Sequence, residues 1–296
     1  MRIFAVIIIP FAFSFTSCDS FLVNKRKLRH HLQAKQKGST HNWNHEPFDF
    51  SSRIGWDKFY KEGNQSVEGK SVEDLEYEWH SHIPHSVIVD VIAPTIDAAS
   101  NYYQQIDTNA PGMPSILLVG TGNSALPRIL HDAFDTPVRV TCLDYSPVCI
   151  EMIRSMYSDL CPNMDFVLGD ATRLKETIDN EQYDVIVDKG LIDALMCGEG
   201  FDSDIEKLMG GIDEVLTKRD WGMSILVCFQ LSKSNRNFFI ELANRSESDN
   251  PNLFWDFDIP VEGSEKGRAT FNVARRCAAH DENRVGSVDH MITDWK

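Results

Sequence analysis

Four short apolar runs of the chain are each followed by residues that can bind a ligand or take part in chemistry. The turn sequences are, in chain order, Gly120-Thr121-Gly122, Asp144-Tyr145, Asp170-Ala171 and Asp188-Lys189. In an open α/β sheet, ligands bind in the crevice outside the carboxyl ends of the parallel strands. If the apolar runs are such strands, the four turns line a single site.

The glycine turn favours a ligand that carries an anionic group. Gly120 and Gly122 lack a Cβ atom, so they tolerate positive φ and allow a ligand to approach the backbone closely. A helix is expected to follow at once, and its N-terminal N–H groups and dipole attract anions. The spacing of Gly120, Gly122 and Ala125 also fits the permissive dinucleotide fingerprint. Alone, the turn fits either a pyrophosphate or the carboxylate of an amino acid.

The next two turns favour an adenosine with an amino-acid tail over a dinucleotide. Asp144 lies 22 residues after Gly122 and can accept hydrogen bonds from both ribose hydroxyls, while Tyr145 can stack on adenine. Asp170 can accept from the adenine amine, and the N–H of Ala171 can donate to a ring nitrogen. Dinucleotide dehydrogenases do not regularly need that second acid. A helix-terminal acid at Asp144 and a core ring at Tyr145 remain the structural alternatives.

The fourth turn lies where reacting groups are expected. In "VIVDKGLIDALM", Asp188, Lys189 and Gly190 follow the strand near the expected reversal of strand order, and Asp193 comes shortly after. A surface ion pair between Asp188 and Lys189, with Asp193 capping or pairing locally, is the alternative.

The elements that must hold these turns alternate along residues 114–296, the expected core domain. Strands are expected at 115–120, 138–144, 164–168, 183–188 and 222–229, and helices at 125–134, 147–160, 204–216 and 235–244. The strands are rich in Val, Ile and Leu with little alternation, which is typical of strands buried on both faces. The pattern predicts an α/β fold with a doubly wound, mostly parallel sheet.

Both ends of this core carry further features. Strands at 253–259 and 269–276 flank a turn-rich stretch, so they predict an antiparallel hairpin at the sheet edge, which nicotinamide-binding domains usually lack. Residues 46–113 are expected to form an N-terminal cap, with a helix at 86–103 interrupted near Pro94. The aromatic residues of this cap are Trp56, Phe59, Tyr60, Tyr77 and Trp79.

Composition and charge limit the classes of function. Hydrophobic content is 42% and charged content 25% over 296 residues, as in globular proteins. Residues 1–45 hold seven Lys or Arg against one Asp, a net charge of +6. The remaining residues must therefore carry −21 to give the total charge of −15. That acidic body disfavours nucleic acid, and it either suits a basic protein partner or aids solubility. The seven cysteines form no CxxC pair, so we expect reduced core thiols and no metal site.

Residues 1–45 are interpreted as a targeting segment that is removed or lies outside the fold. Residues 3–15 are apolar and resemble the core of a signal peptide, too short to span a bilayer comfortably. Residues 21–45 contain six Lys or Arg and no acid, as in organelle transit peptides. The two parts together resemble the plastid address of algae with complex plastids. A mitochondrial presequence, secretion, lipidation at Cys18 or a cytoplasmic protein are the alternatives, and no integral span is expected in the mature chain.

At these motifs the chain resembles the class I S-adenosylmethionine-dependent methyltransferases, and within them the eukaryotic elongation factor 1A lysine methyltransferase and methyltransferase-like 13 group. The motifs are "WDKFY" (56–60), "YEW" (77–79), "LLVGTGNSAL" (117–126), "LDYSPVCI" (143–150), "GDATRL" (169–174) and "VIVDKGLIDAL" (185–195). The resemblance implies a Rossmann-like sheet of seven strands whose last strand is antiparallel.

The resemblance also implies S-adenosyl-L-methionine as the cofactor. Its implied contacts are Trp56, Tyr60, Trp79, Gly120, Asp144, Tyr145, Asp170, Ala171 and Lys189, to which the glycine turn adds Gly122 and Asn123. The aromatic segment would cover the cofactor and shield its sulfonium, whose charge attracts aromatic faces. The helix N-terminus beyond Gly122 would face the methionine carboxylate. The chain departs from the wider class at Leu118, where an acid often stands.

The expected reaction is methyl transfer to a nitrogen nucleophile, with a protein lysine as the favoured acceptor. In-line displacement by a neutral amine needs alignment and loss of a proton, but neither a nucleophilic side chain nor a metal. Asp188 and Asp193 would orient the amine, and the acidic body would attract a lysine-bearing protein. A small-molecule acceptor, a nicotinamide-dependent oxidoreductase and a non-catalytic binding domain are the alternatives.

Overall fold

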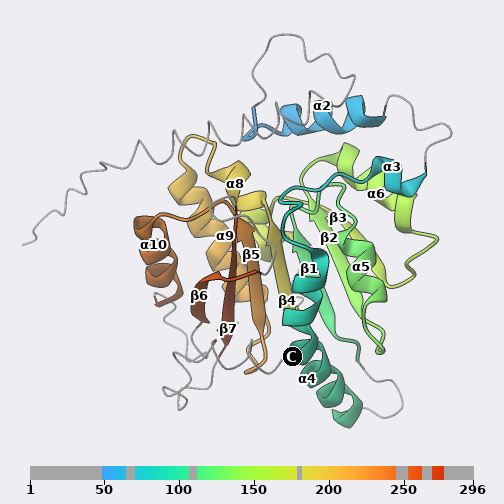
Figure 1. The fold of residues 1–296 in the computed structure, drawn as a ribbon, viewed down its shortest axis with the longest axis vertical. Helices are drawn as coiled ribbons and strands as arrows, with labels where there is room; N and C mark the ends of the chain where they lie inside the picture. Colours follow the sequence, from blue (N-terminus) through green and yellow to red (C-terminus); the bar gives the residue numbers. More distant parts are fainter. Residues whose placement is uncertain are drawn as a thin grey trace, which may run out of the picture. The chain divides into compact units, whose positions relative to one another are not determined.

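The computed structural model describes residues 49–64, 71–106, 112–178, 182–244, 253–261 and 269–276. The expected targeting segment lies outside these residues, as do Cys18 and Cys277. The described chain forms one seven-stranded sheet with the order β3-β2-β1-β4-β5-β7-β6 (Figure 1). No helix among these residues is long and apolar enough to cross a membrane.

The predicted strands are all present. The parallel strands are β1 (Ser115–Val119), β2 (Arg139–Asp144), β3 (Met164–Leu168), β4 (Val185–Lys189) and β5 (Met223–Cys228). Every residue of β1 and β5 is buried, which agrees with their mostly apolar sequences. Since β1 pairs with both β2 and β4, the strand order reverses beside it, and ligands of such sheets bind at this point.

The C-terminal hairpin also forms as predicted. Strand β7 (Thr270–Arg276) lies antiparallel to β5, and β6 (Leu253–Ile259) pairs antiparallel with β7 at the sheet edge. Only β7 therefore runs against the other strands of this sheet. The fold is an α/β, Rossmann-like sheet with one reversed strand.

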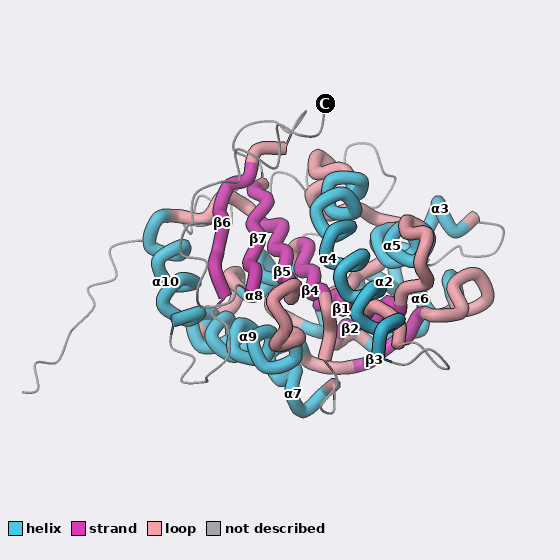
Figure 2. The backbone as a smooth tube through the Cα atoms, turned by 90° about the horizontal axis from the view of Figure 1, so that it is seen from below, coloured by secondary structure: helices cyan, strands magenta, loops and turns pink. Residues whose placement is uncertain are grey.

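Helices cover both faces of the sheet. On one side lie α4 (His85–Ile106) and α5 (Leu126–Asp132), and on the other α9 (Phe201–Val215) and α10 (Lys233–Asn244) (Figure 2). Helix α6 (Pro147–Tyr157) begins as predicted, with the Ser146 hydroxyl accepting a hydrogen bond from the N–H of Cys149. Shorter elements are η1 (Ala171–Arg173), α7 (Leu174–Thr177) and α8 (Leu191–Leu195).

The prediction that α4 is interrupted near Pro94 is wrong. The helix continues through Pro94 for 22 residues in all. Proline removes the hydrogen bond to the carbonyl of Asp90, but both residues face solvent, where water can satisfy that carbonyl. Ile88, Ile92 and Ile96 hold the opposite face of the helix in the core, so packing maintains the helix through the proline.

Two helices of the N-terminal cap have no counterpart in the sequence prediction. These are α2 (Arg53–Asn64), which carries "WDKFY", and the single turn α3 (Val72–Leu75). Figure 1 shows α2 above the end of the sheet where α8 lies. The aromatic cap thus covers the carboxyl ends of the strands.

Candidate active site

The glycine turn adopts the conformation that its sequence predicts. Gly120 has a φ of +62° and Gly122 a φ of +58°, both in the left-handed region. A Cβ atom at Gly120 would lie 2.9 Å from the Cβ of Leu191, and one at Gly122 would lie 3.3 Å from the Tyr60 hydroxyl. Backbone conformation and close packing both require glycine here.

Asp144 fastens the glycine turn to the end of β2. Its Oδ2 accepts a hydrogen bond of 3.0 Å from the N–H of Gly122, and its Oδ1 accepts one of 2.9 Å from the N–H of Ser146. Burial raises the pKa of the Asp144 carboxyl, although these two donors act against that rise. The Cys149 thiol also hydrogen-bonds to this carboxylate, and the Asp144 side chain is 5% exposed.

Tyr145 and Asp170 lie on the same side of the site as Asp144. The charges of Asp144 and Asp170 both act on the Tyr145 hydroxyl and, after burial, help to raise its pKa. Asp170 is exposed and caps η1, because its Oδ1 accepts from the N–H of Thr172 at 2.9 Å. Ala171 is buried at the first position of η1. The predicted adenosine contacts are therefore neighbours.

The aromatic residues of the cap form one contiguous group. The Trp56 ring stacks on Tyr60 at 5.9 Å and meets Trp79 edge to face at 5.6 Å. Phe59 and Tyr77 join them at 5.5 Å from each other. The group spans α2 and the segment after α3, so residues far apart in sequence provide one aromatic wall beside Gly122.

Residues 75–80, which we call the strap, are held across the carboxyl edge of the sheet by hydrogen bonds. The N–H of Tyr77 donates to the carbonyl of Asn123 at 3.0 Å, and the Asn123 amide donates to the carbonyl of Leu75 at 2.6 Å. The Lys189 ammonium donates to the carbonyl of Trp79. Asn123 and Lys189, predicted as cofactor contacts, thus also bind the strap.

Glu78 is the strap residue that sequence reasoning missed. Its carboxylate accepts from the Ser124 hydroxyl at 2.8 Å, the N–H of Ala125 at 2.7 Å and the Lys189 ammonium at 2.7 Å. The N-terminus of α5, expected to face the methionine carboxylate, meets the Glu78 carboxylate instead. The sequence signal for Glu78 is its position between the two aromatic residues of "YEW".

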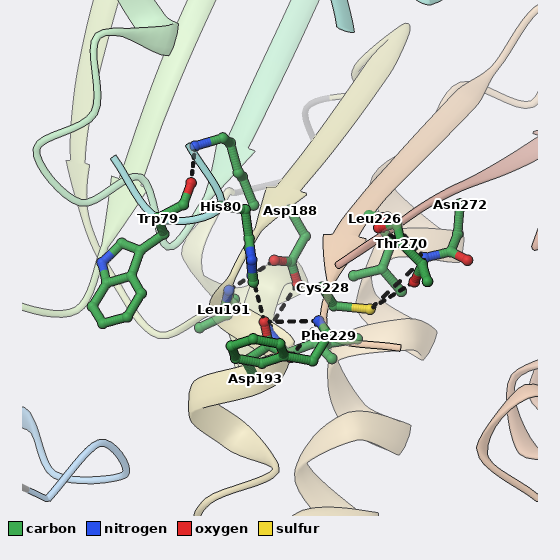
Figure 3. Close-up of polar contacts among 12 residues, drawn as sticks. Trp79, His80, Asp188, Leu191, Asp193, Leu226, Cys228, Phe229, Thr270 and Asn272 are labelled. Atoms are coloured by element: carbon green, nitrogen blue, oxygen red, sulfur yellow. Dashed lines mark hydrogen bonds and ion pairs between the residues drawn. The ribbon is translucent and has the colours of Figure 1, made fainter. Parts of the chain in front are cut away.

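A second buried cluster lies at the end of β4 (Figure 3). Asp188 accepts from the N–H groups of Leu191 at 2.8 Å and Ile192 at 3.1 Å, and so begins α8. Asp193 accepts from His80 Nε2 at 2.7 Å and from the N–H of Phe229 at 3.0 Å. Burial and then the Asp193 charge raise the pKa of Asp188 to about 8.

His80 was also missed by the sequence prediction. It is 3% exposed, has a φ of +53°, and packs edge to face on Phe229 at 4.9 Å. A non-glycine residue with positive φ is held there by its surroundings, here the bond to Asp193 and the Phe229 ring. The strap therefore connects the glycine turn with the acidic end of β4.

A cavity opens between the strap and the glycine turn. Its lining includes Tyr77, Trp79, Gly120, Thr121, Asn123 and Lys189. Four of the predicted cofactor contacts thus share one cavity: Trp79, Gly120, Asn123 and Lys189. This lining does not include Asp144, the last residue of β2, or Asp170, which follows the end of β3.

Comparison with known proteins identifies the class of enzyme. A family model described as a methyltransferase domain matches residues 116–217, which run from β1 to just beyond α9. Residues 116–217 thus match a methyltransferase domain, and the enzyme is an S-adenosylmethionine-dependent methyltransferase. The cofactor is S-adenosylmethionine.

The methyltransferase is similar to two lysine methyltransferases. It is 29% identical to the mitochondrial citrate synthase-lysine N-methyltransferase of Danio rerio over 185 residues, 60% of this chain and 67% of that protein. It is 36% identical to the eEF1A lysine and N-terminal methyltransferase of Xenopus laevis over 104 residues, 34% of this chain and 14% of that protein. Among solved structures, a CurJ carbon methyltransferase aligns with a TM-score of 0.48 and 10% identity, over 88% of this chain and 67% of that one.

The residues at the site of the methyltransferase fit the chemistry of S-adenosylmethionine. The left-handed glycines provide the backbone cradle that Cβ atoms would fill, Asp144 and Asp170 offer acceptors for ribose and adenine, and the aromatic group suits a sulfonium. When bound, S-adenosylmethionine supplies an electrophilic methyl group. The task of the chain's own residues would be to align the acceptor with that methyl group.

Proposed function

We propose that this methyltransferase transfers the methyl group to a lysine ε-amine of a protein. The observation that carries the proposal is the pair of relatives. One relative is named as a methyltransferase of a citrate synthase lysine and the other as a methyltransferase of an eEF1A lysine. The protein substrates in these names differ, but the acceptor side chain in both is lysine. Because the chain is only 29% identical to the first relative and covers 14% of the second, neither named substrate is transferred to this chain.

The end of β4 supports an amine acceptor. One cluster of buried titratable side chains consists of Asp188, Asp193 and His80. It lies beside the Lys189-Gly190 turn, where the strand order reverses. Both carboxylates already accept hydrogen bonds from the backbone, so in this proposal they fix α8 and the strap and shape the path of the amine. Their direct contact with the amine remains a prediction.

The proposal is tested with the purified chain, methyl-labelled S-adenosylmethionine and a lysate of the source organism. We expect a labelled protein band whose acid hydrolysate contains methylated lysine. Label only in small molecules, in arginine or in protein N-terminal amines would contradict the proposal. Heat-treated enzyme gives the background for each fraction.

We also propose that residues 1–45 direct the protein to an organelle. The apolar stretch followed by a basic, acid-free stretch supports this, and the relative from Danio rerio is named as mitochondrial. A fluorescent fusion of residues 1–50 that stays in the cytosol would contradict the proposal. Localisation to plastid or mitochondrion distinguishes the two addresses.

A further inference from the structure

The amino-acid tail of S-adenosylmethionine carries an ammonium as well as a carboxylate, so an anion near the glycine turn would stabilise it there. The last residues of β1, Leu118 and Val119, carry no charge. Asp144 lies on the β2 side, where the ribose acceptors gather. Glu78 reaches the turn from the other side, between the start of α5 and the end of β4.

The contacts of Glu78 keep its carboxylate charged and fixed. Burial alone would raise the pKa of Glu78, but the hydrogen bond from His85 and the charge and hydrogen bond of Lys189 lower it to about 2. The carboxylate is 22% exposed, with the Ser124 hydroxyl, the Ala125 N–H, Lys189 and His85 already bound to it. The residues on either side of it in the chain, Tyr77 and Trp79, line the cavity, as does its partner Lys189.

We propose that Glu78 binds the α-ammonium group of the cofactor's methionine tail. The Glu78–Lys189 pair then presents one negative and one positive group to a tail that carries one of each, at the end of the site opposite Asp144 and Asp170. Glu78 is thus a cofactor-binding residue in addition to a clamp for the strap. The inference does not depend on which acceptor receives the methyl group.

The test compares ligands that differ only in the tail, by calorimetry on the full chain. S-Adenosylhomocysteine carries the whole tail, its deaminated analogue lacks the ammonium, and 5′-methylthioadenosine lacks both charged groups. We expect Glu78→Gln to weaken binding of S-adenosylhomocysteine by about 10- to 100-fold, the usual range for a charge-assisted hydrogen bond. Binding of the deaminated analogue and of 5′-methylthioadenosine is expected to change less than about twofold.

Glu76→Gln is the matched control. Glu76 lies on the same strap, and its carboxylate binds Arg128 and Tyr157. This variant reports what a loosened strap alone does to binding, and it is expected to affect all three ligands equally. An equal loss for all three ligands in Glu78→Gln, or an unchanged affinity for S-adenosylhomocysteine, would overturn the proposal.

A measurement on the wild-type chain covers the case in which Glu78→Gln does not fold. Removing the ammonium from the ligand is then expected to weaken binding by about 10-fold or more. Glu78→Asp provides the second variant, because it keeps the charge on a shorter side chain and should retain part of the preference for the ammonium. Equal affinity of the wild-type chain for the deaminated and complete ligands would refute the proposal without any variant.

Discussion

At the scale of single residues, Asp188 makes stability depend on pH. Its raised pKa of about 8 means that the folded chain keeps a proton that the unfolded chain loses near pH 4. Between these values the unfolded state binds fewer protons, so this group lowers stability as pH rises, by up to about 1.4 kcal/mol per pH unit. Above about pH 8 the effect levels off.

Asp188→Asn removes this titration. We expect the free energy of unfolding of the wild type, relative to that of the variant, to fall steadily from about pH 5 to about pH 8. Denaturant unfolding at several pH values measures both chains. Parallel pH profiles for the two chains would contradict the assignment.

Two glycines of the chain should respond in opposite ways to alanine. Gly122→Ala places a Cβ atom at a φ of +58° and 3.3 Å from the Tyr60 hydroxyl, so we expect a loss of about 1–2 kcal/mol and weaker cofactor binding. Gly210→Ala lies inside α9, where a Cβ meets nothing within 4 Å, and should stabilise by about 0.5–1 kcal/mol. Thermal unfolding and calorimetry check both, and a neutral Gly122→Ala would show that the turn tolerates a side chain.

At the scale of elements, Asp184 fastens α4 to the sheet. The carboxylate is fully buried and accepts from the N–H of Ser115 at 2.9 Å, the Trp221 indole at 2.9 Å and the Tyr103 hydroxyl of α4 at 3.1 Å. Asp184→Ala leaves these donors unsatisfied, so we expect a loss of about 3 kcal/mol in unfolding free energy.

The exposed Asp220→Ala is the control for that loss and should change stability by less than about 0.5 kcal/mol. Chemical denaturation measures both variants. An Asp184→Ala chain as stable as the control would show that these hydrogen bonds do not hold α4 to the sheet.

Strands were predictable because each is a local pattern, whereas the strap was not. Strands β1, β2 and β5 are buried on both faces almost throughout, and their bounds in the structure fall within one residue of the predicted ones. Glu78 accepts hydrogen bonds from residues that are 46 and 47 positions away in the sequence. His80 forms a hydrogen bond with Asp193, which is 113 positions away. No local pattern encodes pairings of that span, so the roles of Glu78 and His80 emerge only in the folded chain.

At the scale of the whole molecule, the acidic charge should speed the encounter with a basic acceptor. Residues 46–296 carry a formal charge of −21, and salt screens such attraction beyond about 10 Å at 0.1 M. For the protein acceptor found by label transfer, we expect kcat/KM to fall by about 10-fold between low salt and about 0.3 M salt.

The affinity for S-adenosylhomocysteine, a ligand without net charge, is the control and should change little with salt. Steady-state methylation and calorimetry over the same salt series separate the two effects. A kcat/KM that is independent of salt would show that the acidic body serves solubility alone.

The aromatic group of the cap gives the molecule an optical property of its own. Trp56 of α2 and Trp79 of the strap lie 5.6 Å apart with ring planes at 72°, close enough for their excited states to couple. The near-ultraviolet circular dichroism of this pair depends on the distance and angle between the two rings. We expect Trp79→Phe to abolish that signal, and cofactor titration of the wild type to change it. An unaltered spectrum in the variant would assign the signal to other tryptophans, whereas the expected result gives a label-free measure of how α2 lies against the strap.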